Sequence, residues 1–160
     1  MSTHPTHPSI PDWVLSKMIQ FCSYQERNMQ EVANKLKTFH LQEGMDEMII
    51  QYLKQEKYLD EARYAKVYAS GKIRINKWGK VKIYASLQQK QVPEFFILQG
   101  LNEVDNEEYE NVLINVLVAK NKLLKEKDPY KRKQKLAKYA TTKGFESDVV
   151  WKVLNTDAIA

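Results

Sequence analysis

The stretch EKYLDEARYAKVYASGKIR, residues 56–74, decides the fold because it marks where one helical unit ends and the next begins. Asp60 stands where a helix N-cap is expected, since its carboxylate can accept hydrogen bonds from backbone N–H groups without a helical partner. Glu61 adds negative charge at the positive end of the helix dipole. Leu59 before the cap and Tyr64 after it have the spacing of a hydrophobic staple. The side chains that this helix is expected to bury are Tyr64, Ala65, Tyr68 and Ala69.

Helical patterns continue on both sides of this stretch. Apolar residues recur three and four positions apart from Asp12 onward, as on the buried face of an amphipathic helix. Further helix starts are marked by Asn28, Asp105 and the Asp128-Pro129 pair. Only five glycines and five prolines occur in 160 residues, and no segment alternates with the period of a strand. The sequence therefore predicts an all-α protein.

Three details of the helices are specific enough to be checked. Pro93 is expected in the first turn of a helix, where its missing N–H removes no hydrogen bond. Val81 falls on the apolar stripe of the helix that follows Asn76. Leu123 falls on the buried stripe of a long helix that is expected to run from Asp105 to about Lys127.

The apolar positions repeat along the chain. Val32, Ile83 and Leu136 can be superimposed with a period of about fifty residues, allowing three extra residues in the first copy. Such a period is the signature of tandem units that are each too small to bury an apolar face alone. We predict three tandem three-helix repeats that form an elongated, curved helical array. The predicted segments are a disordered tail at 1–11 and repeats at 12–58, 59–104 and 105–155. The other matched positions are Leu36, Leu87 and Ala140; Leu41, Val92 and Phe145; Ile49, Ile97 and Val150; and Leu53, Leu101 and Leu154.

Positive charge is concentrated in two blocks. Residues 72–90 contain six lysines and arginines and no acid, and residues 120–143 contain ten with only two acids. An acidic cluster at 103–110 separates them. Two basic blocks in a chain of net charge +5 favour a polyanion or an anionic protein surface as the partner.

Several other classes of function are disfavoured. Cys22 is the single cysteine and falls on an apolar stripe, so it is expected to be a small buried hydrophobic residue. His4 and His7 lie in the predicted tail and would make a poor metal site. The sequence has no phosphate-binding glycine loop and no hydrolase or zinc-protease motif. We expect no enzyme activity, no cofactor and no metal, and a cytoplasmic monomer without signal peptide or membrane span.

The motifs resemble the RecX family of bacterial recombination regulators. The junction from Leu53 to Ala65 is similar to the family pattern L-x-x-x-G-Y-L-D-D-x-R-F-A, with Lys57 in place of the glycine. Altered copies of the repeat motif occur at 28–41 and 78–92, and residues 131–154 are similar to the closing repeat. The family's Lys-Gly pair is replaced by Phe39-His40 and Lys90-Gln91 in the first two copies, so those turns are expected to be longer or differently shaped.

The resemblance implies a non-enzymatic regulator of the RecA recombinase. RecX proteins bind the RecA filament on DNA, lie in its helical groove, and slow ATP hydrolysis and strand exchange. The roles implied are in DNA repair, homologous recombination and the SOS response. An array of repeats with cationic faces could follow such a groove, and salt would weaken the binding.

The predicted binding residues are cations off the apolar stripes, which would dock on the filament groove or on phosphates of single- or double-stranded DNA. Trp78 is expected to pack between repeats, with a partner-facing position as the alternative. Arg63 is expected to brace the interface between repeats. The main alternative is a direct, largely sequence-nonspecific DNA-binding helical module, because lysines suit phosphates better than base edges. A helical scaffold for an unrelated protein partner is a third possibility. The predicted RecA- or DNA-binding residues are Lys72, Arg74, Lys77, Lys80, Lys82, Lys131, Arg132, Lys135 and Lys138.

Overall fold

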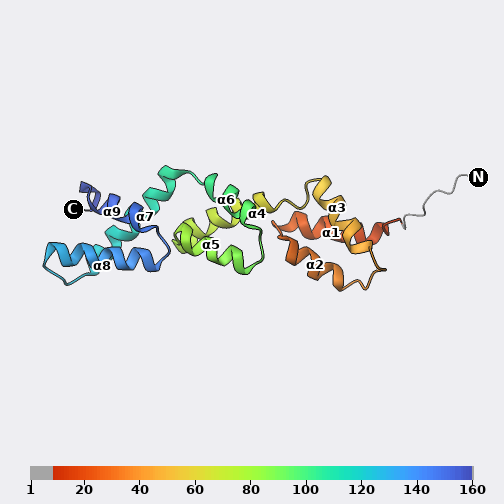
Figure 1. Ribbon diagram of the computed structural model, residues 1–160, viewed down its shortest axis with the longest axis horizontal. Helices are drawn as coiled ribbons and strands as arrows, with labels where there is room; N and C mark the ends of the chain where they lie inside the picture. Colours follow the sequence, from red (N-terminus) through yellow and green to blue (C-terminus); the bar gives the residue numbers. More distant parts are fainter. Residues whose placement is uncertain (1–8, 160) are drawn as a thin grey trace, which may run out of the picture. The chain divides into compact units, whose positions relative to one another are not determined.

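The computed structural model describes residues 9–159, and within them all regular structure is helical (Figure 1). Our predictions for His4, His7 and most of the tail lie outside the described residues. The chain divides into two compact units, Met1–Tyr64 and Ala65–Ala160. The helices are α1 Asp12–Tyr24, α2 Met29–Lys37, α3 Met45–Gln55, α4 Glu61–Gly71, the π-helical turn η1 Lys72–Asn76, α5 Lys80–Gln89, α6 Glu94–Asn102, α7 Asn106–Leu123, α8 Pro129–Thr142, α9 Ser147–Leu154 and the short 3-10 turn η2 Asp157–Ile159.

The predicted helix starts are confirmed at four positions. The side chains of Asn28, Asp60, Asp105 and Asp128 each accept a hydrogen bond from the backbone N–H three residues later, at 2.8, 3.0, 2.8 and 2.9 Å. Each bond satisfies one donor in the first turn that has no helical acceptor. A capping side chain therefore marks the start of each of these four helices.

The first unit is a three-helix core followed by the junction. Its fully buried side chains come from α1, α2 and α3 and form one apolar cluster. Cys22 is part of this cluster, and burial raises the pKa of its thiol, as expected for a residue that acts as a small hydrophobe. Arg63, as predicted, braces the junction: its Nε donates to Glu26 Oε1 at 2.6 Å, and its guanidinium donates to the carbonyl of Tyr58. The central side chains of this core are Val14, Met18, Val32, Leu36, Ile49 and Leu53.

The burial of the matched positions supports the fifty-residue period. Val32, Ile83 and Leu136 are all buried, and so are their partners one helical turn later. Of the positions that follow, only Leu41 in the first copy is partly exposed. The fold is thus built from three-helix repeats. Our assignment of these repeats to 12–58, 59–104 and 105–155 remains a proposal.

The turn after the second helix of the second repeat differs from our expectation. His40 and Gln91 adopt left-handed backbone conformations, with φ of 50° and 62°, at the positions matching Gly144, whose φ is 98°. In the second and third copies the turn is closed by the same kind of bond, from Val92 to Leu87 and from Phe145 to Ala140. Because the surrounding helices impose the turn, residues that disfavour this conformation still adopt it. The second turn is therefore not reshaped by the loss of glycine.

Three local predictions were wrong. Pro93 is the residue just before α6 rather than inside its first turn. Val81 is 57% exposed, because α5 buries Ile83 and Leu87 and turns the preceding apolar residue outward. The long helix α7 ends at Leu123, which is 75% exposed. The chain leaves the helix there because Leu124 is already extended.

Within the second unit, the start of α5 docks on the turn before α9. The backbone N–H of Gly79 donates to the carbonyl of Lys143 at 2.9 Å, and that of Val81 donates to Gly144 at the same distance. Beneath them the rings of Tyr109 and Phe145 are in contact, with centroids 5.4 Å apart. Burial and a hydrogen bond to Glu146 raise the pKa of the Tyr109 hydroxyl. These contacts fix the basic segment at 72–82 against the last helices.

Candidate functional site

The middle basic block begins with an unusual piece of backbone. After α4 the chain continues through the wider turn η1 and reaches Lys77, which is left-handed with φ 58°. The N–H of Trp78 then closes the turn on the carbonyl of Lys72 at 3.1 Å. Wider π-helical turns are rare and are frequent at functional sites. Here the turn brings the side chains of Lys72 and Trp78 together.

Lysines gather around two aromatic rings at this turn. The Nζ of Lys82 lies 4.5 Å from the centroid of the Trp78 ring, and that of Lys72 lies 4.9 Å from it. Lys72 also approaches the ring of Tyr68 at 5.4 Å, and Lys90 approaches the same ring at 5.7 Å. We name these five residues the Trp78 lysine cluster. The aromatic faces hold the cations by cation–π attraction.

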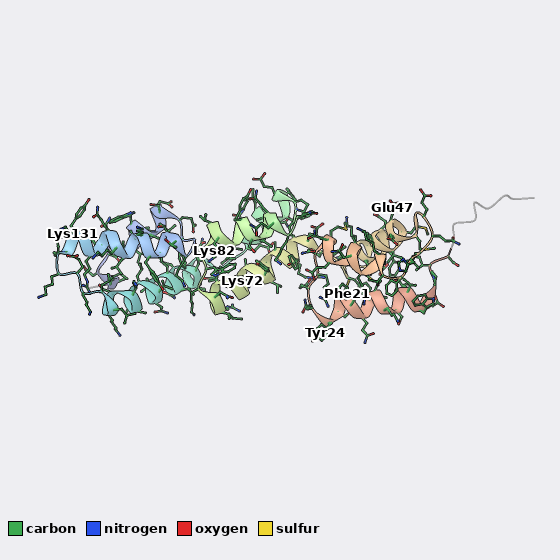
Figure 2. All side chains as sticks on the ribbon, turned by 90° about the horizontal axis from the view of Figure 1, so that it is seen from below. Phe21, Tyr24, Glu47, Lys72, Lys82 and Lys131 are labelled. Carbon is green, nitrogen blue, oxygen red and sulfur yellow. The ribbon has the colours of Figure 1, made fainter. Side chains whose placement is uncertain are left out.

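The cluster lies on the surface of the second unit. Figure 2 shows Lys72 and Lys82 near one another, with Lys131 at the far end of α8. Lys82 is exposed and Lys72 and Trp78 are half-buried. Because both ammonium groups lie within 5 Å of one ring centroid, they are at most about 9.4 Å apart. Two cations held this close favour a partner with closely spaced negative charges. Trp78 is half-buried and brings the two cations to one ring; whether it also packs between repeats, as we expected, stays a prediction.

The other three cations predicted in this block have different surroundings. Arg74 forms a two-pronged ion pair with Glu108, whose second bond is 3.1 Å long. The pairing raises the pKa of the guanidinium and lowers that of the Glu108 carboxyl. Lys80 lies 4.8 Å from the Tyr109 ring, with its backbone N–H donating to the Tyr109 hydroxyl. Lys77 lines a separate groove, described below.

The last basic block also contains both exposed cations and cations that have partners inside the protein. Lys131 and Lys138 are exposed at α8, as a docking role requires. Lys135 pairs with Glu126 at 3.0 Å, and this contact lowers the pKa of the Glu126 carboxyl. Arg132 is committed to the fold rather than to a partner. Of the four predicted cations of this block, the side chains of Lys131 and Lys138 make neither an ion pair nor a hydrogen bond within the described residues.

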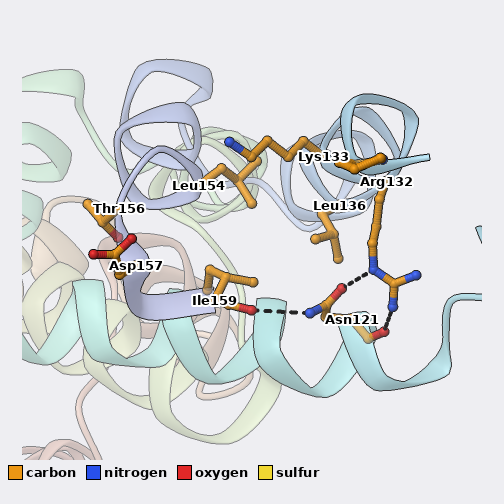
Figure 3. A pocket seen from close by; sticks show the side chains of 9 residues that line it. Asn121, Arg132, Lys133, Leu136, Leu154, Thr156, Asp157 and Ile159 are labelled. Carbon is orange, nitrogen blue, oxygen red and sulfur yellow. Dashed lines mark hydrogen bonds between the residues drawn. The ribbon is translucent and has the colours of Figure 1, made fainter. Parts of the chain in front are cut away.

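Arg132 holds the loop between α7 and α8 (Figure 3). Its Nε donates to Asn121 Oδ1 at 2.6 Å, and its guanidinium also donates to the carbonyls of Asn121, Leu124 and Glu126. The Asn121 amide in turn donates to the carbonyl of Ile159 at 3.2 Å. The adjoining cavity, about 320 Å³, is lined by Asn121, Arg132 and Ile159 of this network and by Leu136 and Leu154. This network is a structural clasp between the last helices.

Sequence reasoning missed three lysines that the fold brings to aromatic rings. Lys120 and Lys143 lie 4.7 and 5.8 Å from the centroid of Tyr139, and Lys90 belongs to the Trp78 lysine cluster. All three stand in the basic blocks, so their charge was visible in the sequence. Their contacts with the aromatic rings could not be predicted from the sequence. For Lys120, for example, the ring belongs to the end of α8, about twenty residues further along the chain.

The described residues offer little for other chemistry. Between residues 9 and 159, no group of three or more His, Cys, Asp or Glu side chains could hold a metal ion. No helix in the described part is both long and apolar enough to cross a membrane.

One buried carboxylate stands out: Glu61 is 8% exposed, and its Oε2 has no hydrogen-bond partner. Burial raises its pKa, with Lys54 opposing the shift.

Two family models match the chain from the junction onward. Residues 60–101 match the second three-helix domain of RecX, and residues 107–154 match the third. Together they cover more than half of the 160 residues. The first matched segment contains the Trp78 lysine cluster. The second contains Arg132 and Asn121 of the structural clasp.

Relatives and solved structures agree with these matches. The chain is 31% identical over 143 residues to "Regulatory protein RecX" of Clostridium acetobutylicum, covering 87% of this chain and 66% of that protein. The corresponding protein of Clostridium perfringens is 31% identical over 121 residues, covering 74% of this chain and 56% of that protein. The chain thus spans somewhat less than two thirds of these relatives.

A crystal structure of regulatory protein RecX is similar with a TM-score of 0.73 and 26% identity, covering 91% of this chain and 73% of the other. RecX from Lactobacillus salivarius shares the fold, with a TM-score of 0.79 at 18% identity, covering 89% of this chain and 93% of that one. The matched three-helix domains, the relatives and the shared fold lead to one conclusion: this chain belongs to the RecX family.

Proposed function

We propose that the protein is a non-enzymatic regulator of the RecA recombinase, which binds the RecA–DNA filament and inhibits ATP hydrolysis and strand exchange. Membership in the RecX family supports a regulatory role, since the relatives carry the name of regulatory proteins. Acting on such a filament places the protein in the cytoplasm and in the control of recombination and DNA repair. The groove of the filament is the binding place that we propose.

The observation that carries this proposal is the Trp78 lysine cluster. It presents Lys72, Lys82 and Lys90 around two rings, in a stretch of nineteen residues without a single acid. A RecA–DNA filament offers both phosphates and acidic side chains, and a cationic surface can meet either. Lys131 and Lys138 on α8 would add contacts on the same unit. Arg74, Arg132 and Lys135 have partners inside the protein and contribute less.

The second candidate is direct DNA binding without strong sequence preference. Lysines interleaved with aromatic side chains, as in the Trp78 lysine cluster, are also used by proteins that bind single strands. Lysine dominates both basic blocks, which suits phosphates rather than base edges. A footprint confined to one duplex sequence at physiological salt would contradict this candidate.

ATP hydrolysis by the cognate RecA on single-stranded DNA distinguishes the two. The protein is titrated well below the RecA concentration, and the DNA is kept in excess so that competition for DNA cannot lower the rate. A filament regulator inhibits under these conditions, and raising the salt relieves the inhibition. If the rate is unchanged while the protein binds bare DNA tightly, the regulatory proposal is wrong and direct DNA binding replaces it.

A further inference from the structure

A second cationic surface lies on the same unit but is separate from the Trp78 lysine cluster. A groove of about 300 Å³ runs between α7 and α8. Three lysines line it: Lys77 from the end of η1, Lys120 from α7 and Lys143 from the end of α8. None of the eight lining residues is acidic. We name this the α7–α8 groove.

The floor of the groove is mostly aliphatic. Val116, Ala119 and Leu123 come from α7, and Tyr139 closes the opposite side from α8. Leu123 is 75% exposed, so a large apolar side chain stands open to solvent beside three cations. An aliphatic surface ringed by positive charge favours a ligand that combines an apolar group with negative charges.

The lysines are positioned by the fold. Lys120 and Lys143 are held 4.7 and 5.8 Å from the centroid of Tyr139. The carbonyl of Lys143 accepts the N–H of Gly79, which fixes the backbone of that wall. Lys77 has a left-handed backbone, which a lysine rarely adopts, and this conformation delivers its side chain to the rim. The three charges thus converge from separate elements.

These observations favour a protein segment over a nucleic acid strand. A single strand needs open aromatic faces on which bases can stack. The lining residues include only one aromatic ring, that of Tyr139, and the remaining floor is aliphatic, so successive bases would find no series of rings for stacking. An acidic peptide with a leucine or phenylalanine between carboxylates matches both the floor and the rim.

We propose that the α7–α8 groove docks an acidic protein segment that inserts one large apolar side chain over Leu123 and pairs its carboxylates with Lys77, Lys120 and Lys143. The apolar side chain gives the contact its selectivity, and the lysines give it an affinity that falls as salt rises. This docking does not depend on the partner being a recombinase, so it stands or falls separately from the function proposed above.

Binding of a fluorescein-labelled twelve-residue peptide by anisotropy tests the proposal. The peptide carries one phenylalanine flanked by glutamates, and its companions are the same peptide with alanine in place of phenylalanine and an oligothymidylate of equal charge. The phenylalanine peptide is expected to bind about tenfold more tightly than the alanine peptide, as burial of a large side chain predicts. Equal binding of the two peptides, or tighter binding of the oligothymidylate, would overturn it.

Variants of the 160-residue chain locate the site. Lys77→Asn removes the charge and keeps a residue that tolerates the left-handed backbone, and Lys143→Gln removes a second charge. Both are expected to weaken the phenylalanine peptide several-fold, whereas Leu123→Ala should abolish its advantage over the alanine peptide. Lys57→Asn is the matched control, because Lys57 is also exposed and left-handed, with φ 63°, but lies in the other unit. Equal losses for Lys57→Asn and Lys77→Asn would refute the assigned site.

Discussion

Gly79 and Gly144 approach one another so closely that neither position has room for a side chain. A Cβ on Gly79 would lie 2.2 Å from the carbonyl carbon of Gly144 and 2.1 Å from the nitrogen of Phe145. A Cβ on Gly144 would lie 2.4 Å from that of Lys82. This backbone contact holds the segment of the Trp78 lysine cluster against the turn before α9.

Replacing Gly79 by alanine should therefore separate these elements. The new Cβ would meet backbone atoms that cannot rotate away, so we expect Gly79→Ala to lower the free energy of unfolding by about 1–3 kcal/mol or more. Urea denaturation measures this. Gly71→Ala is the control, because a Cβ at Gly71 meets nothing within 4 Å and its backbone is helical. If both variants were equally stable, the close contact would not hold in solution.

Lys131 is a proposed docking residue, whereas its neighbour Arg132 has a structural role. Its guanidinium donates to the Asn121 amide oxygen and to three backbone carbonyls. Arg132→Ala is expected to lower the free energy of unfolding by about 2 kcal/mol, because it leaves half-buried acceptors unpaired. Lys131→Ala, at the exposed neighbour, should change it by less than about 0.5 kcal/mol. An Arg132→Ala protein as stable as the Lys131→Ala protein would contradict the structural role.

Glu61 should make the protein less stable as the pH rises. Since burial raises its pKa above the ordinary value, the folded state binds more protons than the unfolded state between the two pKa values. Stability from this group therefore falls as the pH rises through that window. Glu61→Gln is expected to be more stable than the parent at neutral pH, with the difference shrinking toward pH 4. Thermal unfolding of both proteins across this range checks it, and a constant difference at every pH would show that the carboxyl does not titrate as proposed.

The left-handed turn at Gln91 predicts a stabilising substitution. Gln91 is exposed and has φ 62°, and within the described residues its side chain makes no hydrogen bond that would offset the backbone strain. Gln91→Gly should raise the free energy of unfolding by about 0.5–1 kcal/mol relative to Gln91→Ala, because glycine adopts this conformation without strain. Chemical denaturation of the two variants measures the difference. A glycine variant less stable than the alanine variant would mean that the turn is not left-handed in solution.

The sequence predicted those features of the fold that arise from local chemistry. Asn28, Asp60, Asp105 and Asp128 cap helices because a side-chain oxygen reaches an N–H three residues away, which spacing alone reveals. The fifty-residue period predicted which apolar positions are buried, because equivalent helix faces recur in each repeat. The left-handed conformation of Gln91 was not predictable, because the surrounding helices override the preference of a single residue.

The candidate site was predictable as charge but not as geometry. Lys72 and Lys82 were named from their basic block, but only the turn η1 brings both to the ring of Trp78. Arg74 was named on the same ground and is paired with Glu108, thirty-four residues away. Contacts between distant segments decide which cations are available, and composition does not contain that information.

The measurement to make first is the inhibition of RecA by a variant in which two charges of the Trp78 lysine cluster are reversed. The variant Lys72→Glu/Lys82→Glu is compared with the parent in DNA-dependent ATP hydrolysis, with Lys57→Glu/Lys152→Glu as a control of equal charge change on exposed lysines. Circular dichroism verifies that all three are folded. We predict that the parent and the control inhibit RecA at substoichiometric concentration and that the cluster variant needs at least about tenfold more protein. Inhibition by the cluster variant equal to that by the parent would contradict the proposed role of this surface.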